Sequence, residues 1–313
     1  MIVKLPAPKA IATTFAFVLE NLPTLLRIVW APYLVSFGVT LAFQYYVHSS
    51  IDAFMGGDLT GAQMLGINNQ IGLLNLCVNI ATGLLSIMMS AGILRLVIHG
   101  EKPRLFYFRW TSDEWLLLGT VIATFAVGWA FGFLFSVATL SIAGMLGPNP
   151  VVILVVLPLL FLLVFLVLTV RLYLAFPAAI GRGEFGVGPA WGASSGQFFR
   201  LLAYLVVWLV LGAAWQVAAL ALIVPDVLAA LYDAFTWGPA WITEFDLNMR
   251  IMESVNATTP DGILRIAGLW MFNLVAIVMG SIAMGVAWRM IDEKPARLQG
   301  ATAEGSASSV MGF

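Results

Sequence analysis

Six long apolar stretches constrain the fold of this chain more than any other feature of its sequence. A membrane-spanning α-helix needs about 20 consecutive apolar residues, and six stretches meet that length. They lie near 24–47, 70–98, 116–146, 150–176, 201–224 and 263–288. The stretches are continuous and do not alternate, which excludes the pattern of transmembrane β-strands. The sequence therefore predicts an all-α polytopic membrane protein with six transmembrane helices.

The low content of charged residues leads to the same conclusion. Only 10% of the 313 residues are charged, against roughly 25% in soluble domains. So few charges cannot cover a soluble globule of this size, whereas a lipid bilayer removes the need to cover it. We expect a single integral membrane domain over residues 1–298. The last stretch, 299–313, is small and polar, and it is predicted to be a flexible tail.

The positions of Lys and Arg predict the orientation of the helices. All of the 15 Lys and Arg residues except Arg250 and Arg265 fall on one side of the six-helix layout. Cytoplasmic loops carry such an excess, so both termini are predicted to be cytoplasmic. The opposite side is acidic, and its largest segment is the loop 225–262. Apolar residues recur at helical spacing in that loop, which favours a helix that lies on the outer membrane surface or packs on the helix bundle.

Two similar segments suggest an internal repeat. "RLVIHGEKPRL" begins at Arg95 and "RMIDEKPARL" begins at Arg289, each directly after an apolar stretch. Arg171 ends the fourth stretch in the same way, so these three arginines mark the cytoplasmic edge. An aromatic, amphipathic segment precedes the first, third and fifth stretches. The chain thus reads as three degenerate units, each a cytoplasmic amphipathic helix followed by a transmembrane hairpin. Pro177 interrupts the exit of the second unit.

The sequence contains no pattern of a catalytic, cofactor-binding or metal site. The single cysteine, Cys77, excludes a cysteine cluster and a disulfide framework. No His-Glu-x-x-His pattern, phosphate-binding loop or cluster of carboxylates appears. No charge falls at the centre of a predicted span, whereas proton and ion pathways need such charges. We therefore expect a non-enzymatic protein without a cofactor and without a nucleic-acid partner.

The second apolar stretch carries a polar stripe. Its members recur every three or four residues and share one face of a helix: Asn75, Asn79, Thr82, Ser86 and Ser90. One interpretation is helix–helix packing, in which small and polar residues form bonds across an interface, each contributing about 0.6 kcal/mol. The other is the polar wall of a cavity for a headgroup or solute. In both cases the stripe is expected to face inward, where Gln216 and Asn273 could meet it.

The stretch 170–210 resembles a known family. An arginine-bearing helix end leads to a proline, a Gly-Glu turn, a surface helix with small residues and serine, and an aromatic-arginine entry to the next span. These are Arg171, Pro177, Gly183-Glu184, Ala193-Ser194-Ser195 and Phe199-Arg200. The pattern is similar to bacterial six-helix proteins related to the membrane domain of glycerophosphodiester phosphodiesterases. The resemblance implies a membrane family of largely unassigned function, and it carries over no catalytic residue. No soluble segment here could hold the phosphodiesterase domain.

Taken together, these features predict a multi-pass protein of the bacterial inner membrane. The favoured function is a structural or accessory role, in contact with lipids, with a membrane protein complex or with further copies of the chain. The alternative is a transporter or lipid-translocating protein whose polar site is lined by the second helix. An enzyme embedded in the membrane is the least favoured class, because no base and nucleophile can be assembled from the visible residues.

Overall fold

The computed structural model describes residues 5–56, 61–101, 110–146, 157–229, 232 and 255–292. All regular secondary structure within these residues is helical. The principal helices are α1 (Ala7–Met55), α2 (Gly61–His99), α3 (Ser112–Leu146), α4 (Leu157–Leu172), α5 (Ala175–Arg182), α6 (Val187–Ser194), α7 (Phe198–Ile223) and α10 (Pro260–Ile291). Six helical segments are long and apolar enough to cross a membrane. The prediction of an all-α polytopic membrane protein is confirmed.

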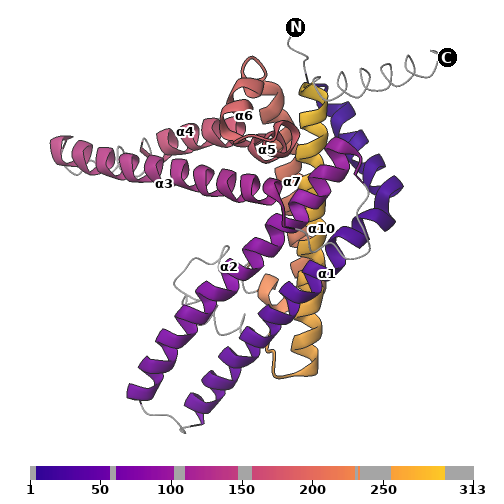
Figure 1. Cartoon of the computed structure of the whole chain (residues 1–313). Coiled ribbons are helices and arrows are strands. Elements are labelled where there is room, and N and C mark those ends of the chain that lie inside the picture. The colour runs from indigo at the N-terminus through magenta and orange to yellow at the C-terminus, as the bar shows by residue number, and fades with distance from the viewer. Residues whose placement is uncertain are drawn as a thin grey trace, which may run out of the picture.

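The first helix differs from the predicted layout. We expected an amphipathic surface helix followed by a separate span near 24–47, but α1 is one helix of 49 residues. At 1.5 Å per residue it is about 73 Å long, more than twice the roughly 30 Å of a hydrocarbon core. Pro23 and Pro32 lie inside α1, and the helix changes direction along its length (Figure 1). Proline removes a backbone hydrogen bond and kinks a helix, which accounts for this bend.

The long helices form two groups. Helices α1, α2, α7 and α10 pack together, with α10 in contact with the other three. The α3–α4 hairpin leaves this group at a steep angle and extends away from it (Figure 1). The short helices α5 and α6 lie where the two groups meet. The hairpin therefore contacts the rest of the protein mainly at one end.

That end, which we call the junction, holds most of the buried core. It comprises α5, α6, the last turns of α2 and α10, and the first turns of α3 and α7. Trp288 is fully buried there, and its indole Nε1 lies 2.4 Å from where a Cβ on Gly181 would stand. The Tyr204 hydroxyl donates to the Ala283 carbonyl at 3.0 Å, and His99 Nε2 contacts the Ile180 carbonyl at 3.2 Å. The junction thus holds the helices together through packing and directional bonds.

The helix of the fourth span is interrupted a few residues before the position predicted from the sequence. We expected Pro177 to interrupt the helix, but α4 ends at Leu172 and α5 begins at Ala175. Pro177 is the third residue of α5. The first N–H groups of a helix have no partner inside it, so a proline is tolerated there. At the other end of α5, Gly183 adopts φ 64°, and its N–H donates to the Ala179 carbonyl.

Several predicted features lie wholly or partly outside the described residues. These are the flexible tail 299–313, most of the acidic loop 225–262, and the first part of the amphipathic segment before α3. Of the three predicted surface helices, the third corresponds to the separate helix α6, which precedes α7. The first is continuous with its span in α1, so the three units are not equivalent in structure.

Candidate functional site

The first of the three edge arginines, Arg95, lies in a buried charge cluster. Its Nε donates to Asp113 Oδ2 at 2.7 Å, and its Nη2 donates to the Glu114 carboxylate at 2.7 and 2.8 Å. The side chains of Arg95 and Glu114 are 5% and 0% exposed. Glu114 also accepts bonds from the N–H and hydroxyl of Thr111, just before α3. The bond from the Thr111 N–H to the Glu114 carboxylate is one half of a capping box at the start of α3, and Arg95 joins this start to the end of α2.

The other two edge arginines also make bonds within the protein. Arg289 donates to the Val97 carbonyl at 3.0 Å, which joins the ends of α10 and α2. Arg171 donates to Ser194 Oγ at 3.4 Å and lies over the Trp191 ring, 5.4 Å from its centre. The two similar segments therefore begin with arginines that lie in the last turns of α2 and α10 and take part in the packing of the junction.

Arg182 is a fourth arginine of the junction, and the sequence analysis did not single it out. It forms an ion pair with Asp292 at 3.1 Å and lies over the Trp288 ring at 5.4 Å. The signal that could have identified it was its place in the Gly-rich turn, next to Glu184. None of these four arginines lines the cavities described below, so their contacts are those of a structural framework.

The polar stripe of α2 divides into two parts. Asn75 and Asn79 are exposed, and Asn79 Nδ2 donates to Asn75 Oδ1 at 3.0 Å along the same helix. We expected the whole stripe to face inward, and these two side chains do not. Ser90 lies near the junction end and accepts a bond of 3.3 Å from Ser281 of α10. At this residue the stripe forms a bond across a helix–helix interface.

Thr82 and Ser86, the middle of the stripe, line a cavity between α1, α2 and α10. We call it the polar cavity, and its volume is about 220 Å³. Its lining residues are Tyr33, Ser36, Thr82, Ser86, Met89, Trp270, Asn273, Leu274 and Ile277. Asn273 therefore lies with the stripe, as the sequence suggested, whereas Gln216 is exposed on α7 and is not part of the lining.

Three polar or aromatic members of the polar cavity, Tyr33, Ser36 and Trp270, were not predicted from the sequence. Tyr33 and Ser36 lie three residues apart on α1 and therefore share one face, a signal that was present in the sequence. Trp270 falls within the predicted span near 263–288. In the structure its ring lies 6.0 Å from that of Tyr33 and 6.2 Å from that of Phe37. It thus packs against α1 at the edge of the cavity.

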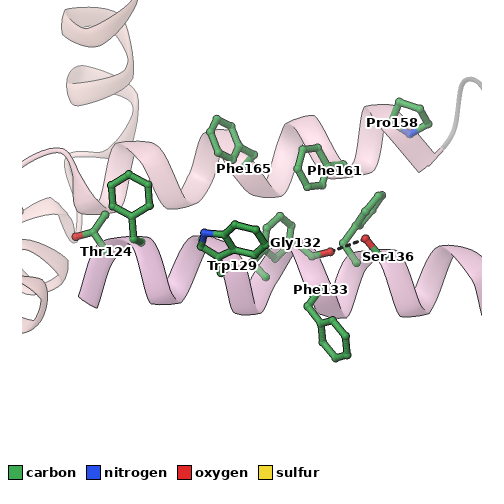
Figure 2. A pocket seen from close by; sticks show the side chains of 12 residues that line it. Thr124, Trp129, Gly132, Phe133, Ser136, Pro158, Phe161 and Phe165 are labelled. Carbon is green, nitrogen blue, oxygen red and sulfur yellow. Dashed lines mark hydrogen bonds between the residues drawn. The ribbon is translucent and has the colours of Figure 1, made fainter. Parts of the chain in front are cut away.

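A second, larger hollow lies between α3 and α4. This groove, the aromatic groove, has a volume of about 900 Å³ and is lined mostly by apolar side chains. The Phe161 ring of α4 lies 5.5 and 4.8 Å from the rings of Phe131 and Phe135 of α3, whereas Figure 2 shows Phe133 pointing away from α4. Gly128 and Gly132 of α3 belong to the lining, and a Cβ added at either would meet no atom within 4 Å. Their small-xxx-small spacing is thus not covered by another described helix.

No group of three His, Cys, Asp or Glu residues is close enough to hold a metal ion in the described part of the chain. Comparison of the chain with protein-family models, with curated proteins and with solved structures finds no match. The function proposed below therefore rests on the geometry of the two hollows and of the junction.

Proposed function

We propose that this chain is a non-enzymatic accessory protein of a membrane assembly, and that the α3–α4 hairpin contacts the partner within the bilayer. One observation carries the proposal: the hairpin extends from the junction with its apolar faces uncovered. None of the residues in the most apolar window of α3 is buried, and the Trp129 side chain is 77% exposed. Beyond the junction, these exposed faces of the hairpin are available to pack on another membrane protein.

The aromatic groove supports a protein partner over lipid alone. Apolar exposure by itself does not drive association in a bilayer, because lipid tails are equally apolar. Small residues do favour association, since they let two helix backbones approach closely. Gly128 and Gly132 provide such a site, and they lie in the groove with open space beside them. The occupant that fits best is an apolar helix of a membrane protein complex.

The test is to fill the groove and measure the partner. Gly132→Leu places a large side chain in the groove, whereas Gly212→Leu is a matched control on α7, where a Cβ also meets no atom within 4 Å. Tagged protein is extracted gently from native membranes, and co-purifying proteins are quantified by mass spectrometry. We expect a stoichiometric partner with the native chain and the control, and its loss with Gly132→Leu. A partner that remains with Gly132→Leu, or none with the native chain, contradicts the proposal.

A second tag distinguishes a different membrane protein from a further copy of this chain as the partner. Co-expression of two differently tagged copies reports self-association, which would make the partner a further copy of this chain. The same extraction also measures retained lipids. If no protein co-purifies and a lipid is retained by the native chain but lost with Gly132→Leu, the groove binds lipid and not a protein partner.

We also propose that the protein lies in a bacterial cytoplasmic membrane with the junction on the cytoplasmic side. The arginines of the junction support this orientation, because cytoplasmic ends of membrane helices carry the excess of Lys and Arg. At the opposite end of α10, Arg265 is paired with Asp261 at 3.0 Å and Asp226 at 3.6 Å. Leu5 and Asp292, near the two ends of the chain, both bond to residues of the junction, so both termini would be cytoplasmic.

The resemblance of residues 170–210 to the membrane domain of glycerophosphodiester phosphodiesterases fits this proposal. That stretch forms α5, α6 and the start of α7, which are the parts of the junction that separate the hairpin from the main group. A related chain would then share the framework of the junction, and it would share no catalytic residue.

A transporter or lipid-translocating protein is the second candidate function. The polar cavity favours it, because Thr82, Ser86 and Asn273 come together between three membrane helices. Transporters place their substrate sites near the membrane midplane in this way. Reconstitution into vesicles distinguishes the two: solute uptake or lipid scrambling above that of protein-free vesicles supports transport, and partner loss with Gly132→Leu supports the accessory role.

A further inference from the structure

The polar cavity lies deep in the membrane-spanning part of the protein. Ser86 precedes Arg95 of the junction by nine residues, which is about 13 Å of helix. Asn273 follows Arg265, at the other end of α10, by eight residues, or about 12 Å. The hydrocarbon core is roughly 30 Å thick, so these side chains stand well inside it. A cavity with polar walls at this depth needs a physical explanation.

Among the described residues, no hydrogen bond joins three of its polar side chains to another residue: Tyr33, Ser36 and Asn273. Ser36 is only 2% exposed, yet its hydroxyl is not among the buried polar atoms that are closed off without a partner. The hydroxyl therefore reaches the open space of the cavity. A buried hydroxyl without a partner is costly in hydrocarbon, and an occupant that forms hydrogen bonds removes this cost.

The Thr82 and Ser86 hydroxyls use only part of their hydrogen-bonding capacity. Thr82 donates to the Val78 carbonyl at 2.8 Å, and Ser86 donates to the Thr82 carbonyl at 2.9 Å. Each hydroxyl proton is thus used within α2, while the oxygen can still accept a bond. The cavity wall therefore offers acceptors at Thr82 and Ser86, hydroxyls that can donate or accept at Tyr33 and Ser36, and a carboxamide at Asn273.

This set of groups defines the chemistry of the occupant. No charged residue lines the cavity, so the occupant is uncharged, because an unpaired charge at this depth would be strongly unfavourable. Hydroxyl groups match the wall best, since each can donate one bond and accept others. The rings of Tyr33 and Trp270 add flat apolar surfaces, which suit the C–H faces of a carbon skeleton that carries hydroxyls.

The volume sets the size of the occupant. About 220 Å³ is far more than the roughly 10–15 Å³ that one water needs. It is less than the roughly 300–1,000 Å³ of pockets for drug-sized ligands. Asn273 is exposed on the side of α10, so the cavity opens toward the surface of the helix bundle. A group attached to a lipid could enter from the bilayer by this route.

We propose that the polar cavity binds a small, uncharged polyhydroxyl group, either the headgroup of a neutral lipid or a free polyol. The inference concerns binding alone, and it does not depend on assembly through the aromatic groove. Thr82 and Ser86 accept hydrogen bonds from the hydroxyls of the ligand, Ser36 and Tyr33 exchange bonds with them, and Asn273 lies at the entrance.

The experiment uses the full chain in phosphatidylcholine nanodiscs. Monooleoylglycerol, a neutral lipid with two free hydroxyls, and free glycerol are the two probes, and native mass spectrometry measures the protein-bound fraction over a range of probe concentrations. Binding of monooleoylglycerol alone identifies a lipid source, and binding of glycerol identifies a free polyol. Binding of neither probe overturns the proposal and leaves water as the occupant.

Variants test whether binding occurs in this cavity. Ser36→Ala and Thr82→Val together remove two hydroxyls without adding atoms to the cavity wall, and we expect roughly tenfold weaker binding. Thr169→Val is the matched control, because the Thr169 hydroxyl also donates to a carbonyl of its own helix, that of Phe165 at 2.9 Å, and it lies on α4. Equal affinity in the double variant and the native chain overturns the proposal, and so does equal weakening by Thr169→Val.

Asn273→Leu provides an independent check if the double variant fails to fold. The side chain is at the exposed entrance, so its replacement should leave packing unchanged while it removes the carboxamide. We expect weaker binding of the probe, and unchanged binding contradicts the site. The Gly132→Leu variant should retain the probe at native affinity, so a failure of the cavity and a failure of the accessory function give different results.

Discussion

The Arg95 guanidinium donates to both oxygens of the Glu114 carboxylate, at 2.7 and 2.8 Å, in a part of the junction that excludes solvent. This pair joins the end of α2 to the start of α3, where the hairpin leaves the other helices. Two charges buried together stabilise a fold only while both are present, because removal of one leaves the other without a partner. The attachment of the hairpin therefore depends on this contact.

Arg95→Met should destabilise the protein strongly. The Glu114 carboxylate would stay buried without its cation, and the expected loss in free energy of unfolding is about 3–5 kcal/mol. Thermal unfolding in detergent measures the change. Arg265→Met is the control, because the carboxylates paired with Arg265 are largely exposed and such pairs contribute about 0–1 kcal/mol. Similar shifts of the melting temperature in the two variants would contradict the prediction that the buried Arg95–Glu114 pair contributes more to stability than the exposed pairs of Arg265.

Gly186→Ala should disturb the contact between α5 and α6. A Cβ at Gly186 would stand 1.8 Å from the Ala175 carbonyl oxygen, so the backbone has to move. Overpacking of this kind costs about 1–3 kcal/mol. Gly188→Ala, two residues later in α6, meets no atom within 4 Å and should be neutral or slightly stabilising. Size-exclusion profiles and melting temperatures of both variants check the prediction, which fails if Gly186→Ala is as stable as Gly188→Ala.

Tyr204→Phe should lower stability without a change of shape. The Tyr204 hydroxyl donates to the Ala283 carbonyl at 3.0 Å and lies 3.5 Å from the Thr14 hydroxyl, so it connects α7 with α10 and α1. The loss of a hydrogen bond with a buried partner costs about 1–3 kcal/mol. Tyr45→Phe changes an exposed tyrosine and should have no effect. Chemical unfolding of the two variants gives the comparison, and equal midpoints would contradict the prediction.

Cysteine labelling tests the orientation. In a Cys77→Ser background, Glu101→Cys introduces a thiol at an exposed residue after α2, next to the junction. Gly56→Cys introduces a thiol at an exposed residue between α1 and α2, at the opposite end of α2. With a membrane-impermeant maleimide on intact cells, we expect Gly56→Cys to react and Glu101→Cys to react only after permeabilisation. The reverse pattern would place the junction outside the cytoplasm.

The candidate site was predicted only in part. Thr82, Ser86 and Asn273 were recognised because polar residues are conspicuous within apolar stretches, and they line one cavity. Tyr33, Ser36 and Trp270 were missed, since nothing in a hydropathy pattern indicates that α1 lies against α2 and α10 at this depth. Asn75 and Asn79 were expected to face inward with the rest of the stripe. They are exposed, because no neighbour in the described part of the chain covers that face of α2.

The sequence by itself determined the class of protein and the number and order of its membrane spans. A spanning helix satisfies its own backbone hydrogen bonds, so its position depends on a local run of apolar residues and needs no knowledge of its neighbours. The tertiary structure decided which helices pack together, that Arg95 is buried against Glu114, and that the α3–α4 hairpin stands apart. Helix packing in a bilayer depends on side-chain shape and hydrogen bonds between distant residues, and neither is visible in hydropathy.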